Sequence, residues 1–127
     1  MTLKYVKAWY DRLPPYERDL PIIILEGYAY TPRMILSEVE RGTDIGRKLQ
    51  KYVESGRLGT TLRQEQQLAK IRLKEILGKM PEKPIIASLS GKTYTPSQLL
   101  KEIEQETGIG KQWIQNEIKH AKRMLVI

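Results

Sequence analysis

The sequence contains no cysteine and no phenylalanine, and it has a single histidine, His120. Without cysteine, disulfide bonds, thiolate metal sites and cysteine nucleophiles are excluded. No apolar run approaches the roughly 18 residues that a membrane-spanning helix needs, and residues 1–12 lack the apolar segment of a signal peptide. We therefore expect a cytoplasmic protein that has no membrane partner.

Signals for catalysis are equally scarce. The chain has neither a Walker-type phosphate loop nor a nucleophile elbow, and His120 is expected on the flank of the last helix as a structural or solvated residue. Glu102 and Glu106 lie one helical turn apart and could hold Mg²⁺ through their oxygens. No other candidate ligand lies near them in the sequence, so we expect solvated carboxylates. The sequence predicts no enzyme activity, no cofactor and no metal.

Positive charge is what the chain has in excess. It carries 22 lysines and arginines against 15 aspartates and glutamates, a net charge of +7 in 127 residues. A basic surface favours nucleic acid, acidic proteins or anionic lipid without selecting among them. This length suffices for one domain or for two small modules packed together.

One stretch of the chain occurs twice. YTPRMILSEVERGTDIGRK begins at Tyr30, and YTPSQLLKEIEQETGIGKQ begins at Tyr94. Aligned without a gap, they share Tyr, Thr, Pro, Leu, Glu, Glu, Thr, Ile and Gly at the same places. The segments before them, PIIILEG (21–27) and PIIASLSG (84–91), also correspond, with one residue gained in the second. This repetition predicts a duplicated structural module.

Each copy is predicted to begin with a strand. Residues 22–25 are apolar and rich in β-branched side chains, and they are bounded by a proline and a glycine. Residues 85–89 are the equivalent run in the second copy. We expect these two strands to pair with each other, because that pairing would bury the edge that each copy alone exposes.

Two helices are predicted after each strand. Thr31 and Thr95 are expected N-caps, followed by a proline at the first helical position. A glycine, Gly42 in one copy and Gly108 in the other, is expected to form the turn in a left-handed conformation. The second helix of each copy is expected to begin at the next isoleucine.

The rest of the chain completes a mainly α fold with short β-strands. Residues 2–13 are predicted to form an amphipathic helix, residues 60–77 a connecting helix and residues 78–84 a linker. The predicted domains are the N-terminal helix with the first strand–helix–turn–helix module (1–59), the connecting helix and linker (60–80) and the second module (81–127).

The end of the second copy, LLKEIEQETGIGKQWIQNEIKHAKRMLVI, resembles the helix-turn-helix of DNA-binding proteins over residues 100–125. Thr107-Gly108-Ile109 resembles the turn, and the recognition helix would follow from Lys111. The apolar positions of that family are occupied by Ile103, Ile109, Ile114 and Ile118. Glu104 stands where the family carries a small residue between the two helices. The resemblance implies that the second helix enters the major groove of DNA.

The polar face of this second helix supplies the predicted nucleic-acid-binding residues. Lysines suit phosphates, while Gln and Asn can form paired hydrogen bonds with adenine. In the second copy these residues are Lys111, Gln112, Gln115, Asn116, Lys119 and Lys122. In the first copy they are Arg47, Lys48 and Lys51. A further basic stripe, Arg63, Lys70 and Lys74, is expected on the connecting helix.

The leading prediction is a small basic protein that binds double-stranded DNA as a transcriptional regulator or architectural factor. Two alternatives stay open. Residues 108–111 also resemble the phosphate-binding hairpin of helix-hairpin-helix proteins. Otherwise the chain is a protein-interaction or assembly module without nucleic acid, a homodimer for example, in which Trp113, Tyr52 and Met124 form the interface. An exposed apolar patch that joins Trp113 to Met124 and Val126 would favour this last alternative.

Overall fold

The computed structural model describes residues 3–126 and is mainly helical. The described chain contains, in order, the elements α1 (Leu3–Arg12), the 3₁₀-helix η1 (Pro15–Asp19), β1 (Ile23–Leu25), β2 (Tyr28–Tyr30), α2 (Pro32–Glu40), α3 (Asp44–Ser55), α4 (Leu62–Gly78), β3 (Ile85–Ile86), β4 (Thr93–Tyr94), α5 (Pro96–Glu104) and α6 (Gly108–Val126). Within these residues no helix is both long enough and apolar enough to cross a membrane.

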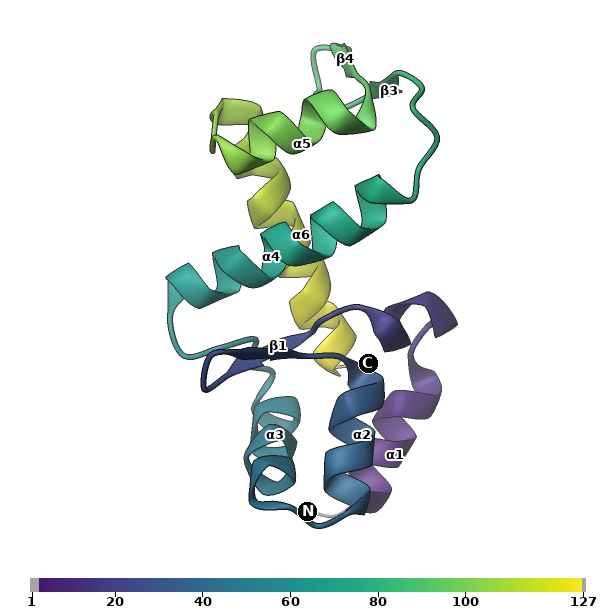
Figure 1. Cartoon of the computed structure of the whole chain (residues 1–127), viewed down its shortest axis with the longest axis vertical. Helices are drawn as coiled ribbons and strands as arrows, with labels where there is room; N and C mark the ends of the chain where they lie inside the picture. Colours follow the sequence, from purple (N-terminus) through teal and green to yellow (C-terminus); the bar gives the residue numbers. More distant parts are fainter. Residues whose placement is uncertain (1–2, 127) are drawn as a thin grey trace.

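Two groups of elements lie at opposite ends of the long axis, and two helices cross between them (Figure 1). The N-terminal group consists of α1, α2, α3 and the β1–β2 hairpin, whereas α5 and the β3–β4 hairpin lie at the other end. Helices α4 and α6 cross in contact with each other. Helix α6 begins beside α5 and ends against the N-terminal group, where Trp9 Nε1 donates a hydrogen bond to the Met124 carbonyl at 2.7 Å.

The strands pair within each copy, so the predicted pairing between the copies is wrong. Strand β1 is antiparallel to β2 with Ile23 opposite Tyr30, and β3 is antiparallel to β4 with Ile85 opposite Tyr94. Glu26 and Gly27 have positive φ values, 52° and 83°, which is the geometry of a tight two-residue hairpin turn. Such a turn reverses the chain directly after β1, so that β2 lies beside β1. Closing this short loop costs little conformational entropy.

The predicted helix caps are confirmed. Thr31 accepts a hydrogen bond from the Met34 N–H, and Thr95 accepts one from the Gln98 N–H, with a proline at the start of each helix. The hydroxyl satisfies an amide that has no partner within the helix. Residues 22–55 and 85–126 therefore share the same order of elements, a hairpin followed by two helices.

A glycine with positive φ was predicted in the turn between the two helices of each copy, and this prediction is correct in the first copy only. Gly42 has φ of 68°, as expected for a glycine that ends a helix. The aligned residue of the second copy is Glu106, with φ of 52°, whereas Gly108 is the first residue of α6. A side chain therefore stands in a conformation that usually favours glycine.

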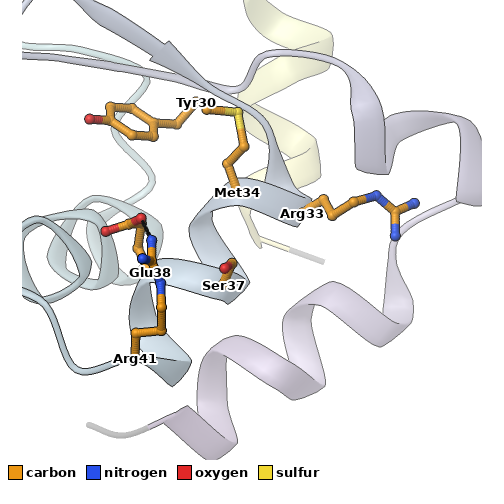
Figure 2. Close-up of a pocket in the computed structure, with 6 residues that line it drawn as sticks. All are labelled: Tyr30, Arg33, Met34, Ser37, Glu38 and Arg41. Atoms are coloured by element: carbon orange, nitrogen blue, oxygen red, sulfur yellow. Dashed lines mark hydrogen bonds and ion pairs between the residues drawn. The ribbon is translucent and has the colours of Figure 1, made fainter.

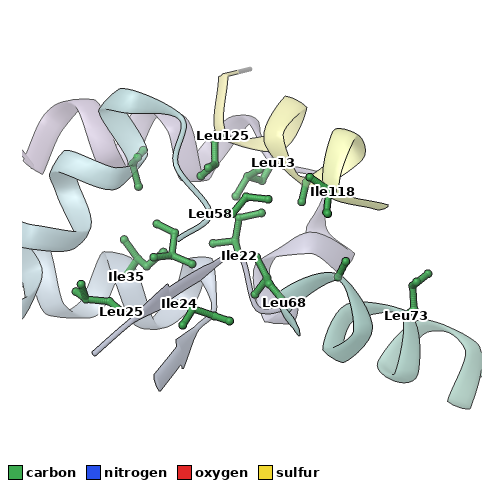
Figure 3. Packing of buried hydrophobic residues seen from close by; sticks show 14 of the residues in the cluster. Leu13, Ile22, Ile24, Leu25, Ile35, Leu58, Leu68, Leu73, Ile118 and Leu125 are labelled. Atoms are coloured by element: carbon green, nitrogen blue, oxygen red, sulfur yellow. The ribbon is translucent and has the colours of Figure 1, made fainter. Parts of the chain in front are cut away.

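A single apolar cluster connects both ends of the molecule. It contains Leu13 and Ile22 from the N-terminal group, Leu68 and Leu73 from α4, and Ile118 from α6. Figure 3 shows part of this cluster, where side chains of β1, α4 and α6 meet. The inward faces of α4 and α6 are thus used for packing, and only their outward faces remain for a partner.

A buried charged network joins the same elements. Arg72 on α4 is fully buried, and its Nη2 donates to both carboxylate oxygens of buried Glu17 at 2.8 and 2.9 Å. Its Nε donates to Glu117 of α6 at 2.8 Å, and its Nη1 donates to the Pro21 carbonyl at 2.9 Å. His120 Nε2 lies 3.1 Å from Glu17 Oε2, so the lone histidine has a structural contact. The network ties η1, α4 and α6 together.

Candidate nucleic-acid interface

The turn between the two helices of each copy is held by one threonine. Thr107 Oγ1 accepts a hydrogen bond from the Gly110 N–H at 3.3 Å and donates one to Glu102 Oε1 at 3.0 Å. Thr43 makes the same two contacts in the first copy, with the Gly46 N–H at 2.9 Å and with Glu38 Oε1 at 2.7 Å. The threonine therefore caps the second helix and binds the first helix at the same time.

The two helices of each copy approach each other closely at a glycine of the second helix. A Cβ built on Gly110 would lie 2.0 Å from the Glu102 carbonyl oxygen, and one built on Gly46 would lie 2.4 Å from the Glu38 carbonyl oxygen. Glu104, which stands where the helix-turn-helix family carries a small residue, is exposed, and the close approach is made at Gly110 instead. The signal was visible in the sequence, because an Ile-Gly pair occurs at this place in both copies.

Helix α6 has an apolar inner face and a polar outer face, as predicted. The residues of the inner face, Ile114, Ile118, Ala121 and Leu125, are buried. The residues predicted to bind DNA all belong to the exposed part of the helix: Lys111, Gln112, Gln115, Asn116, Lys119 and Lys122. The only acidic residue of α6, Glu117, is bound to Arg72, so the outer face itself contributes no carboxylate.

The positive charge on that face is largely uncompensated. Lys122 Nζ lies 3.1 Å from Glu65 Oε2 of α4. Lys111 and Lys119 form no ion pair with any part of the chain that the structure describes. Unpaired ammonium groups remain available to neutralise phosphates.

The basic residues of α3 are exposed but are interleaved with acids. Arg47 Nη1 lies 3.1 Å from Asp44 on the same helix. Lys48 Nζ lies 2.7 Å from Glu26 at the tip of the first hairpin, and this hydrogen bond raises the pKa of Lys48. Lys51 shares its part of the surface with Glu54. The face of α3 is therefore a weaker anion-binding surface than that of α6.

The basic stripe predicted for α4 is mostly engaged within the molecule. Lys70 Nζ and Arg63 Nη1 lie 2.7 and 3.4 Å from the Glu106 carboxylate. The hydrogen bond from Lys70 is the main reason that the pKa of Glu106 is lowered. Glu106 is thus paired with two cations, and Glu102 accepts a hydrogen bond from Thr107. Both carboxylates are half-buried rather than solvated. The described residues contain no cluster of three or more His, Cys, Asp and Glu side chains that could bind a metal ion.

Trp113 and Met124 do not form the exposed apolar patch that would favour a protein partner. Trp113 is half-buried, and its Nε1 donates to the Ala87 carbonyl at 2.9 Å. Met124 is also half-buried and lies at the opposite end of α6, where its carbonyl binds Trp9. The two side chains therefore do not join into one patch along α6.

A shallow hollow of about 280 Å³ lies over α2 and the first hairpin. Figure 2 shows its lining, in which Arg41 bonds to Glu38 and Arg33 points away from Tyr30. Arg33 is itself bound to Asp19 at 2.8 Å. Both arginines are therefore already paired, and the hollow is a poor candidate for an anion site.

No known protein family matches the chain, and no curated protein or solved structure is significantly similar to it. The face of α6 therefore has to be judged by its own geometry and charge.

Proposed function

We propose that the protein binds double-stranded DNA and that α6 is the helix that enters the major groove. The observation that carries this proposal is the outer face of α6, where lysines and amides stand together and to which α6 itself contributes no carboxylate. An α-helix fits the major groove of B-DNA, which is about 12 Å wide. The buried inner face anchors the helix to the core, so the backbone of α6 needs no ordering on contact.

The side chains divide into two roles. Lys111 and Lys119, two turns apart on α6, would neutralise phosphates and set the register of the helix. Gln112, Gln115 and Asn116 would form hydrogen bonds with base edges, for which adenine offers the matching donor and acceptor.

The first copy would add a weaker contact. We interpret the repeated stretch as a duplicated module whose α3 meets the phosphate backbone through Lys51 and the partly paired Arg47 and Lys48. Contact with successive major-groove faces would need a separation of about 34 Å between the two helices. Under this proposal the protein acts in the cytoplasm as a regulator or architectural factor.

The test is fluorescence anisotropy of a labelled random-sequence duplex, repeated at salt concentrations from about 50 to 200 mM. We expect binding that weakens steeply as salt rises, because phosphate contacts release counterions. A Lys111→Ala/Gln115→Ala/Lys119→Ala variant should bind at least about tenfold more weakly and lower the salt slope by about 2.

Lys4→Ala/Lys7→Ala is the matched control, since it also removes two positive charges but from α1 at the other end of the molecule. It should change affinity by less than about threefold. Equal losses in the two variants would show that only net charge matters. An absence of binding at the lowest salt would reject DNA as the partner and favour a protein partner instead.

A further inference from the structure

The loop between β3 and β4, residues 87–92, is an ordered turn with an apolar tip. The Ala87 N–H donates to the Lys92 carbonyl at 3.1 Å, and the Gly91 N–H donates to the Ser88 carbonyl at 3.1 Å. The hydroxyls of Ser88 and Ser90 lie 2.8 Å apart. Leu89, at the centre of this turn, is 100% exposed. A leucine in this position contributes nothing to the core, so its apolar side chain is free to meet a partner.

The same loop lies directly beside the proposed DNA-binding face. A hollow of about 260 Å³ separates them, lined by Ile86, Ala87, Ser88 and Leu89 on one side and by Gln112, Trp113 and Asn116 on the other. The hydrogen bond from Trp113 Nε1 to the Ala87 carbonyl fixes the loop to α6. Anything that reaches Gln112 and Asn116 therefore also approaches Leu89.

The charge around the hollow favours a polyanion. Its lining contains no acidic residue, and two lysines lie close to the lining in the chain. Lys111 immediately precedes Gln112, and Lys92 lies three residues after Leu89. The first hairpin is different, because its tip carries Glu26, which is paired with Lys48. The hairpin of the second copy is one residue longer than that of the first. Where the first hairpin has an acidic tip, the second has the sequence Ser-Leu-Ser-Gly-Lys.

We infer that the β3–β4 loop is a second DNA-contacting element, with Leu89 packing into the minor groove next to the major groove that α6 occupies. The inference rests on the proposed function of α6. A helix about 10–12 Å across fills a major groove of about 12 Å, so a loop at its side lies over the bordering backbone. Apolar side chains are the residues that proteins insert from the minor groove. Ser88 and Lys92 would contact the intervening phosphates.

The first test replaces Leu89 with Ala and measures affinity for duplex DNA. We expect about tenfold weaker binding with the same salt slope, because an apolar contact is lost while every charge is kept. Leu3→Ala is the matched control, an exposed leucine on α1 at the other end of the molecule, and it should leave affinity unchanged. Leu89 is fully exposed and Leu3 is 40% exposed, so neither change removes a buried core side chain.

The second test attaches a crosslinker to a single introduced cysteine, which is possible because the natural sequence contains none. A Leu89→Cys variant carries one thiol, to which a benzophenone photocrosslinker is attached, and Leu3→Cys is the control. We expect crosslinking to DNA at position 89 only. Saturating an A·T-rich duplex beforehand with a minor-groove ligand should abolish that crosslink while α6 binding persists.

The outcomes separate the two proposals. If the natural protein does not bind DNA, the function of α6 is wrong. Suppose instead that the natural protein binds DNA and that the Lys111→Ala/Gln115→Ala/Lys119→Ala variant loses affinity. If Leu89→Ala then binds normally and position 89 does not crosslink, only the inference about the loop is overturned. Crosslinking that survives the minor-groove ligand would contradict the assigned groove.

Discussion

Gly110 packs directly against the main chain at Glu102, and a Cβ at Gly110 would lie 2.0 Å from the Glu102 carbonyl oxygen. This contact sets how closely α5 and α6 cross, and the crossing determines which face of α6 is exposed. Helix packing of this kind is sensitive to a single carbon atom.

Gly110→Ala is expected to destabilise the protein by about 1–3 kcal/mol, because the helices must move apart to admit the methyl group. Urea unfolding followed by circular dichroism measures the change. Gly108→Ala is the control on the same helix, since a Cβ there meets nothing within 4 Å. Because Gly108 is the first residue of α6, where helix propensity counts less than in the interior, this change should alter stability by less than about 0.5 kcal/mol. Equal effects of the two changes would contradict the close crossing.

Arg72→Met is expected to cost about 3–5 kcal/mol of unfolding free energy. The change would leave the carboxylates of Glu17 and Glu117 without their guanidinium partner, and Glu17 is completely buried. Chemical denaturation measures the loss. Adding Glu17→Gln to Arg72→Met should recover part of it, because the unpaired buried charge is removed. A double variant less stable than Arg72→Met alone would refute this account of the network.

Ile114→Ala is expected to destabilise by about 2–5 kcal/mol, because Ile114 is buried on the inner face of α6 and its loss leaves a cavity. Val126→Ala, at the exposed end of the same helix, should change stability by less than about 0.5 kcal/mol. Thermal unfolding of both variants measures these changes in stability. Equal melting temperatures would mean that the faces of α6 are assigned wrongly.

The ion pairs of Glu106 predict a specific acid sensitivity. Because the pKa of Glu106 is lowered in the folded state from its ordinary value of 4.5, its stabilising contribution is complete above that value and is lost as the pH falls through the lower folded value. The stability difference between the natural protein and Glu106→Gln should therefore shrink as the pH falls from about 6 to about 3. Urea titrations at each pH measure it.

Lys70→Met supplies the control for this pH dependence. Lys70 donates the hydrogen bond that lowers the pKa of Glu106 most, so its removal should flatten the dependence. A pH profile unchanged by Lys70→Met would show that the pair does not operate in solution.

The sequence predicted the parts of the fold that depend on neighbours along the chain. Thr31 and Thr95 cap their helices as expected, since an N-cap acts on an amide three residues away. The stripe from Ile114 to Leu125 is buried because helical periodicity places these residues on one face. The exposure of the α6 lysines and amides follows from the same periodicity.

Contacts between distant residues could not be predicted in this way. The strands were expected to pair between copies, and local hairpin turns decided otherwise. Arg72 was unremarkable in a polar helix sequence, yet it lies buried between Glu17 and Glu117. Arg63 and Lys70 were expected in a basic stripe on the connecting helix, and the fold pairs both of them with Glu106.

The sequence by itself determined the helices, their caps, their apolar faces and the excess of positive charge, because periodicity and capping act within a few residues. Only the tertiary structure decided which of those charges remain unpaired. Ion pairing depends on distances of a few ångströms between residues far apart in the chain. For this reason Arg63 and Lys70 of the basic stripe on α4 are paired with Glu106, whereas Lys111 and Lys119 on α6 remain exposed and unpaired.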